Sequence, residues 1–340
     1  MQDKALKQAY IPLVLSKQVV TFINVIKELG EDHYPLLSKT DLPENIEILE
    51  AGFITREVVT DFFATMDSAL PDHIKYQVIR QAAYRNARYI IQCFNLKAAE
   101  TLVDALSIFT CYAQGISTDT NFEVKTYMDK PWLICRRRHI NKTWFRFSET
   151  YVVCVLIEII RQLIGKQWAT SMIRIQSKSI YLEALPQPFQ GLPVFACREG
   201  TGIHIGNDQL DKKISHWDQT DKPAPYPHDI LRQKSFDLSL RKALAPYLCE
   251  GRISLRKATK ITKLTKRTLQ RRLNDINTTF SQLLDDTLEE EAKRLLQSQE
   301  LSITQVSYLL GYITPAHFSR AFKRMTEQTP KAYRQQINSM

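Results

Sequence analysis

The chain has 340 residues, of which 44% are hydrophobic and 24% charged, and its formal net charge is +10. This composition is ordinary for a globular protein with sizeable cores, and the length suffices for two domains. The start, MQDKALKQAY, lacks the basic-then-apolar pattern of a secretory leader, and the most apolar run, residues 151–164, is too short to span a bilayer and contains Glu158 and Arg161.

The positive charge is concentrated in the last third of the chain. Residues 1–230 contain 26 basic and 26 acidic residues, so their net charge is zero. Residues 231–340 contain the other 20 basic and 10 acidic residues, which gives the whole excess of +10. This asymmetry predicts a module that binds a polyanion, and it favours nucleic acid over a membrane surface.

The N-terminal part shows a mixed pattern. Apolar residues at helical spacing predict helices over residues 16–30, 54–70 and 95–115. The period then changes, and it predicts strands over 122–139 and 143–149, an apolar helix over 150–164, and short strands over 171–175, 179–185 and 202–206. We therefore expect an α+β domain over residues 1–217.

The six cysteines and the other reactive side chains indicate no catalytic or metal site. Cys135 and His139 are spaced like metal ligands, but no second pair follows, so structural residues of a strand are favoured. No GxSxG, HExxH or credible triad is present, and we expect no enzyme activity, cofactor or metal. Without a CxxC pair, the thiols are expected to be reduced and structural in a cytoplasmic protein: Cys93, Cys111, Cys135, Cys154, Cys197 and Cys249.

Three other features of this part have both a functional and a structural interpretation. The arginines at 136–138 would suit an anion, but a solvated hairpin edge is favoured. Residues 200–206, GTGIHIG, resemble a phosphate loop without its strand–loop–helix context, so a hairpin is favoured. Four tryptophans would suit an effector pocket, although core packing is the default: Trp132, Trp144, Trp168 and Trp217.

A linker follows the mixed region. Residues 218–230, DQTDKPAPYPHDI, place prolines at 223, 225 and 227, which favours extended backbone and stops helices. The linker coincides with the change in charge, so we place it at 218–235. Residues 236–340 show no strand pattern and predict an all-α domain of at least six short helices.

The all-α domain contains two similar pairs of short helices. TLQRRLND at 268–275 and HFSRAFKR at 317–324 align at an offset of 49 residues. Leu269 and Leu273 share one side of the first segment, as Phe318 and Phe322 do in the second. In each copy an upstream helix and a tight turn precede the segment, and Thr265 and Thr314 are the predicted N-caps. This order predicts two helix-turn-helix subdomains.

Further local signals support the second copy and the segment between the copies. Ser302 with Gln305 predicts a capping box, Gly311 a turn, and Pro315 the first residue of the final segment. Residues 280–297, FSQLLDDTLEEEAKRLLQ, carry one apolar stripe and predict a linker helix roughly 27 Å long, at about 1.5 Å per residue. Successive major-groove openings on one side of a duplex are ~34 Å apart. A rigid helix of this length would suit two helices that read consecutive grooves.

LTKRTLQRRL at 264–273 and LSITQVSYLLGYITPAHFSRAFKRMTEQTPKAYR at 301–334 resemble the double helix-turn-helix signature of AraC/XylS-type transcription regulators. The resemblance covers residues 250–338. The chain departs from the family where the first turn, KITKLTKRT, lacks the usual glycine or methionine, and where Asn277 and Tyr312 replace a common glycine and phenylalanine. Residues 1–230 resemble, more weakly, the arabinose-binding type of effector and dimerisation domain.

The resemblance implies a sequence-specific regulator of double-stranded DNA. The implied DNA-binding residues are Lys266, Arg267, Gln270, Arg271, Thr314, Pro315, Ala316, His317, Ser319, Arg320 and Lys323. Lys266, Lys323, Arg272 and Arg324 are expected to hold phosphates, and the others to contact bases, except that His317 would either contact a base or only flank the helix. The implied partners are a second copy of the chain, a small-molecule effector and RNA polymerase, but no membrane. Two alternatives stay open: a dimeric regulator without an effector, and an enzyme or DNA-repair domain fused to the DNA reader.

Overall fold

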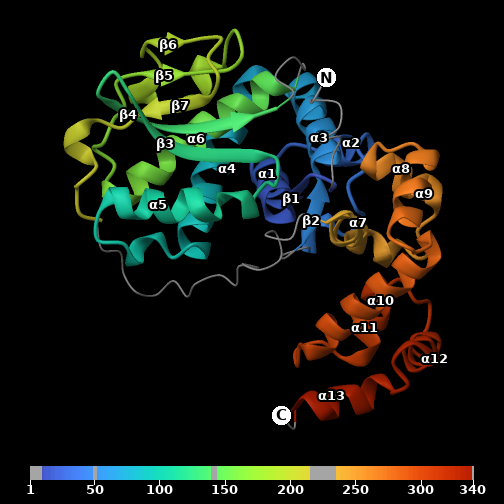
Figure 1. Ribbon diagram of the computed structural model, residues 1–340. Helices are drawn as coiled ribbons and strands as arrows, with labels where there is room; N and C mark the ends of the chain where they lie inside the picture. The colour runs from blue at the N-terminus through green and yellow to red at the C-terminus, as the bar shows by residue number, and fades with distance from the viewer. Residues whose placement is uncertain (1–9, 49–51, 139–143, 215–234, 339–340) are drawn as a thin grey trace. The chain divides into compact units, whose positions relative to one another are not determined.

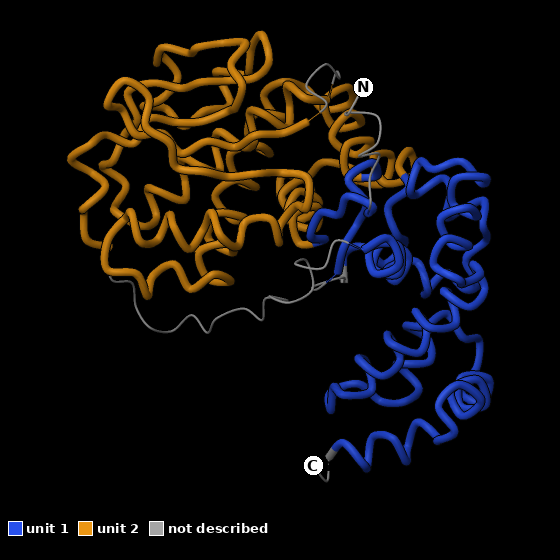
Figure 2. The backbone as a smooth tube through the Cα atoms, viewed as in Figure 1, with its two compact units in different colours: residues 1–16, 41–58, 233–340 blue, residues 17–40, 59–232 orange. Residues whose placement is uncertain are grey.

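The computed structural model describes residues 10–48, 52–138, 144–214 and 235–338. The chain forms two compact units, which Figure 2 distinguishes by colour. Unit 1 contains Met1–Ser16, Asp41–Val58 and Gln233–Met340, and unit 2 contains Lys17–Thr40 and Val59–Arg232. The expected linker lies almost wholly outside the described residues, so its bounds stay a prediction.

Unit 2 is built around a five-stranded sheet with the order β3-β4-β7-β5-β6. Its strands are β3 (Thr120–Tyr127), β4 (Lys130–Arg137), β5 (Ile173–Arg174), β6 (Val194–Phe195) and β7 (Thr201–His204). The predicted region 122–139 is the β3–β4 hairpin, in which Phe122 lies opposite Cys135. Met128 and Asp129, both at positive φ, form its two-residue turn, because left-handed backbone matches the twist of the flanking strands.

Helices complete unit 2 (Figure 1). They are α1 (Ser16–Glu28), α2 (Tyr34–Ser38), α3 (Arg56–Ala69), α4 (Asp72–Cys93), α5 (Leu102–Tyr112) and α6 (Phe145–Ile164), with the first residues of α1 and α3 assigned to unit 1. The long helix α6 packs between α4 and the sheet. Glu149, fully buried on α6, accepts backbone N–H bonds from Gln176 (2.7 Å) and Ser177 (3.1 Å), which ties the helix to the chain after β5.

Three sequence predictions for unit 2 are wrong. Residues 143–149, predicted as a strand, contain the first turn of α6, a helix buried on nearly all sides, so its apolar pattern carries no helical period. Residues 179–185 contain the short 3-10 helix Leu182–Ala184 instead of a strand. The strand predicted over 202–206 is confirmed as β7 (Thr201–His204), but the hairpin favoured for 200–206 is wrong, because β7 pairs with β4 on one side and β5 on the other.

Unit 1 combines a small strand pair with the C-terminal helices. The strands β1 (Leu13–Leu15) and β2 (Phe53–Thr55) are antiparallel. The helices are α7 (Phe236–Leu244), η8 (Ala245–Glu250), α8 (Leu255–Thr262), α9 (Lys266–Asp275), α10 (Phe280–Gln297), α11 (Ile303–Leu309), α12 (Pro315–Thr326) and α13 (Pro330–Asn338). The fold class is therefore as expected: mixed α and β in the N-terminal part, and all-helical from Phe236 to Asn338. Among the described helices, none is long and apolar enough to cross a membrane.

Candidate nucleic-acid interface

The first helix-turn-helix consists of α8 and α9. Ser254 caps α8 by accepting from the backbone N–H of Lys257 (3.1 Å), and Thr265 caps α9 by accepting from Thr268 N (3.1 Å). Lys263, at φ 52°, takes the left-handed conformation that ends α8. The turn therefore forms without the glycine usual in the family, at the modest strain of a non-glycine residue at positive φ.

Helix α9 has one apolar side and one polar side. Leu269 and Leu273 are buried (0% and 1% exposed), which fixes the orientation of the helix. On the rest of α9, every residue that the sequence assigns to DNA contact is exposed: Lys266, Arg267, Gln270 and Arg271.

The second helix-turn-helix, α11 and α12, confirms the predicted local signals. Ser302 and Gln305 form the capping box of α11. Gly311, at φ 75°, supplies the turn, and Thr314 caps α12 by accepting from His317 N (3.3 Å), with Pro315 as the first helical residue. Pro315 has no backbone N–H. This costs nothing at the first position of a helix, because the first N–H groups have no acceptor within the helix.

Helix α12 is anchored by aromatic rings. Phe318 and Phe322 are fully buried, and their rings pack on each other (5.7 Å between centroids) and on Tyr312 (5.5 Å) and Tyr333 (5.5 Å). Tyr312 thus fills an aromatic position where the family usually has phenylalanine. The predicted contact residues are exposed at Ala316, His317, Arg320 and Lys323 and half-buried at Thr314, Pro315 and Ser319.

Helix α10 joins the two motifs with the bounds that the sequence predicts (Figure 1). Its buried face, which includes Leu283, Ala292 and Leu296, packs against α7, α11, α12 and α13. Arg241 of α7 forms ion pairs with two carboxylates of α10, Asp286 (3.0 Å) and Glu290 (3.2 Å). The helix is thus held by α7, by η8 and by the helices of the second motif, and it follows α9 of the first motif in the chain.

The expected phosphate contact of Arg272 stays a prediction, and the structure shows another role for this side chain. Arg272 is half-buried, and its guanidinium lies 5.2 Å from the centroid of the Phe236 ring. Burial, with Arg271 as a smaller cause, lowers the pKa of this guanidinium. Arg272 therefore stacks on α7, a non-local contact that helical spacing cannot indicate.

The structure also shows a basic groove that sequence reasoning missed. It has a volume of about 490 Å³ and is lined by Arg256, Thr259, Lys260, Lys263, Leu264, Thr265 and Lys266. The lining comes from α8, the turn and the start of α9. The sequence shows the excess of basic residues. It does not show that they line one groove, because that depends on the turn at Lys263.

The other sequence candidates in unit 2 have structural contacts. Cys135 is buried on β4, whereas His139 lies outside the described residues, and the described part holds no cluster of three metal-ligating side chains. Arg136 pairs with Glu123 (2.7 Å), and Arg137 donates to the Ser148 hydroxyl (2.6 Å). Trp132 and Trp168 are buried, and Trp217 lies outside the described residues.

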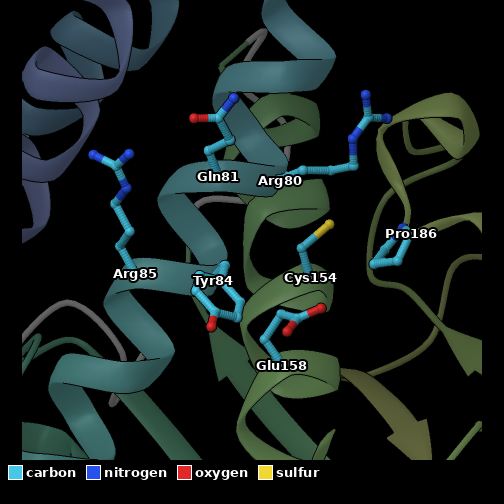
Figure 3. A pocket seen from close by; sticks show the side chains of 7 residues that line it. All are labelled: Arg80, Gln81, Tyr84, Arg85, Cys154, Glu158 and Pro186. Carbon is cyan, nitrogen blue, oxygen red and sulfur yellow. The ribbon is translucent and has the colours of Figure 1, made fainter. Parts of the chain in front are cut away.

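Unit 2 contains a pocket of about 370 Å³ between α4 and α6 that the sequence did not indicate (Figure 3). Glu158 on its α6 side is 9% exposed, pairs with Arg161 (3.3 Å), and has its pKa raised by burial. Arg80 donates to the Glu183 carbonyl (2.6 Å). The lining residues are Arg80, Gln81, Tyr84, Arg85, Cys154, Glu158 and Pro186.

Comparison with known proteins agrees with the geometry of unit 1. Residues 258–336 match the helix-turn-helix domain family. The transcriptional regulator VqsM of Pseudomonas aeruginosa is 24% identical over 283 residues, which are 74% of this chain and 81% of that protein. The regulator GlxA of Rhizobium meliloti is 50% identical over 48 residues, 14% of this chain and 15% of that protein.

Among solved structures, that of the transcriptional regulator CdpR from Pseudomonas aeruginosa covers 93% of this chain and 96% of its own, at 19% identity and a TM-score of 0.41. The matched segment 258–336 contains most of α8 and all of α9, α10, α11 and α12. Residues 258–336 therefore form a helix-turn-helix domain of the AraC type, and the similar proteins are transcription regulators.

Proposed function

We propose that the protein is a sequence-specific transcription regulator that reads two consecutive major grooves of a duplex, one with α9 and one with α12. The observation that carries the proposal is the shared design of the two helices. Each is fixed by a buried apolar pair, Leu269 with Leu273 and Phe318 with Phe322, and each leaves its polar side exposed. Helix α10, which joins the two motifs in the chain, is of a length that suits the ~34 Å between grooves.

Each exposed residue has a proposed role that follows from its chemistry. Arg267 and Arg271 donate bidentate bonds to guanine O6 and N7, and Gln270 pairs with the N6/N7 edge of adenine. In the second groove, Arg320 and Ser319 bond base edges. The start of α12 contributes apolar contact with a thymine methyl from Pro315 and Ala316, and polar contact from Thr314 and His317. Lys266, Lys323 and Arg324 hold phosphates.

The proposal is tested by selecting bound sites from random duplex DNA at a stated salt concentration. Arg271→Ala should then cost about 1–3 kcal/mol at one base position and relax the preference there. Lys323→Ala is the matched control, because it should weaken all sequences alike and reduce the salt dependence of binding by about one charge. An equal loss for selected and random DNA in Arg271→Ala would contradict base reading.

We further propose that the regulator acts as a dimer, in contact with RNA polymerase at its promoters, and responds to a small-molecule effector. The family resemblance supports the dimer, and the spacing of half-sites in the selected DNA tests it together with the mass measured by light scattering. The pocket between α4 and α6 supports the effector, because Glu158 offers a buried carboxyl beside the polar groups of Tyr84 and Arg80.

A thermal-shift screen of a metabolite library tests the effector. A compound at 100 times its Kd should stabilise the protein by about 2.7 kcal/mol. Glu158→Gln should reduce that gain for a ligand that binds between α4 and α6. A screen in which no compound stabilises the wild-type protein would favour the alternative, a regulator without an effector.

A further inference from the structure

The basic groove of the first helix-turn-helix contains a carboxylate from a distant part of the chain. Asp41 Oδ1 lies 2.5 Å from Lys260 Nζ, and Asp41 Oδ2 lies 3.9 Å from Lys263 Nζ. Both lysines line the groove. Their side chains remain 67% and 46% exposed, whereas that of Asp41 is 18% exposed. Asp41 therefore neutralises part of the groove while the lysines stay accessible to a second anion.

The position of Asp41 is fixed by contacts that do not involve its carboxylate. The fully buried Tyr247 donates its hydroxyl to the Asp41 backbone carbonyl (2.6 Å). Further along the same segment, Thr55 Oγ1 donates to the carbonyl of Ile261 on α8 (2.8 Å). Asp41–Val58 belongs to the same compact unit as the helix-turn-helix motifs (Figure 2). The backbone contacts of the segment thus hold the carboxylate of Asp41 at the groove.

The groove has the features of a phosphate site. Four of its lining residues are basic: Arg256, Lys260, Lys263 and Lys266. It opens at the start of α9, where the backbone N–H groups of a ten-residue helix favour an anion. Lys266 is also the residue at which the proposed reading surface of α9 begins, so a duplex engaged by α9 would bring its backbone to this place.

We propose that the basic groove binds a backbone phosphate of the DNA, and that Asp41 competes with this phosphate for Lys260 and Lys263. The proposal rests on the DNA reading proposed above. It adds that Asp41 lowers the affinity of the protein for DNA. Because Asp41 is carried by a segment of the N-terminal part, a change that displaces Asp41–Val58 would free the groove and tighten binding to any sequence.

The test is Asp41→Asn in the full-length chain, measured for binding to a selected duplex and to a random duplex over a range of salt. Asparagine keeps the size of the side chain and the backbone carbonyl that Tyr247 contacts, and it removes only the charge. We expect both duplexes to bind about two- to fivefold tighter at low salt, which is the range for an exposed ion pair. The salt dependence should steepen by up to about one charge, because one more lysine becomes available to phosphate.

Glu44→Gln is the matched control, because it makes the same change of charge on the same segment at an exposed residue outside the groove lining. Lys260→Gln should weaken binding to both duplexes, and in this background Asp41→Asn should have a smaller effect than in the wild type, because only the longer contact with Lys263 remains. Lys260→Gln also provides a test if Asp41→Asn does not fold, because the proposal then still requires Lys260→Gln to lower the affinity for random DNA.

The outcomes separate the two proposals. If the wild-type protein selects specific sites but Asp41→Asn binds no tighter than Glu44→Gln, the competition is refuted and the DNA reading stands. If Lys260→Gln binds random DNA as tightly as the wild type, the phosphate site is refuted. If the wild-type protein binds no duplex at all, both proposals fail together.

Discussion

Gly311→Ala is expected to disrupt the second helix-turn-helix, for two reasons that the structure makes quantitative. Gly311 has φ 75°, a conformation that costs an L-residue about 1–2 kcal/mol. An added Cβ would also lie 2.4 Å from the Leu248 carbonyl oxygen and 2.7 Å from the Gly251 nitrogen. These are backbone atoms at the end of η8 and cannot rotate away, so overpacking adds about 1–3 kcal/mol. The expected loss is about 2–5 kcal/mol.

Hydrogen exchange measured by mass spectrometry is the suitable assay, because all four tryptophans lie at or before residue 217 and fluorescence would not report on α11 and α12. A loss of 2 kcal/mol corresponds to roughly thirtyfold faster opening, at about 1.4 kcal/mol per tenfold. Gly30→Ala is the control, because Gly30 has φ 78° and an added Cβ would meet no atom within 4 Å. Unchanged exchange in α11 and α12 of Gly311→Ala would refute the close packing of the turn on η8.

Two further predictions concern stability. Burial lowers the pKa of Lys242 to about 8. From pH 8 to pH 10 the unfolded chain therefore binds more protons than the folded one, so the free energy of unfolding in urea should rise with pH. Lys242→Met should lose this rise. Parallel plots of this free energy against pH for the two proteins would contradict the prediction. Thr314→Ala removes the cap of α12 and should cost about 0.5–2 kcal/mol. Hydrogen exchange should become faster in the first turn of α12. Ser302→Ala should have the same effect on the first turn of α11. Protection equal to wild type would show that the cap contributes nothing.

The sequence by itself determined the helix-turn-helix motifs, because their signals are local. A cap such as Thr265 or Thr314 bonds a backbone nitrogen three residues away, and the apolar pairs recur at one helical turn. Helix α10 has the predicted bounds because its apolar stripe, its polar side and its ends are all encoded within 18 residues. The exposed faces of α9 and α12 could therefore be named in advance.

Local pattern failed where burial is uniform or the chain pairs with distant segments. Residues 143–149 alternate like a strand, but Phe145–Glu149 begin a helix that is buried on nearly all sides, so its apolar residues show no helical period. Strand β7 was predicted as a strand but placed in a local hairpin, because its two neighbours, β4 and β5, come from elsewhere in the chain. The strands β1 and β2 and the long helix α4 were not predicted.

The tertiary structure alone decided which charges meet. Arg272 and Arg271 are adjacent on α9 and look alike in sequence, yet Arg272 stacks on Phe236 while Arg271 stays exposed. Asp41 lies beside Lys260 although more than 200 residues separate them. Such contacts depend on how whole elements pack, and the energy of a charge depends on its neighbours in space, so neither follows from the spacing of residues along the chain.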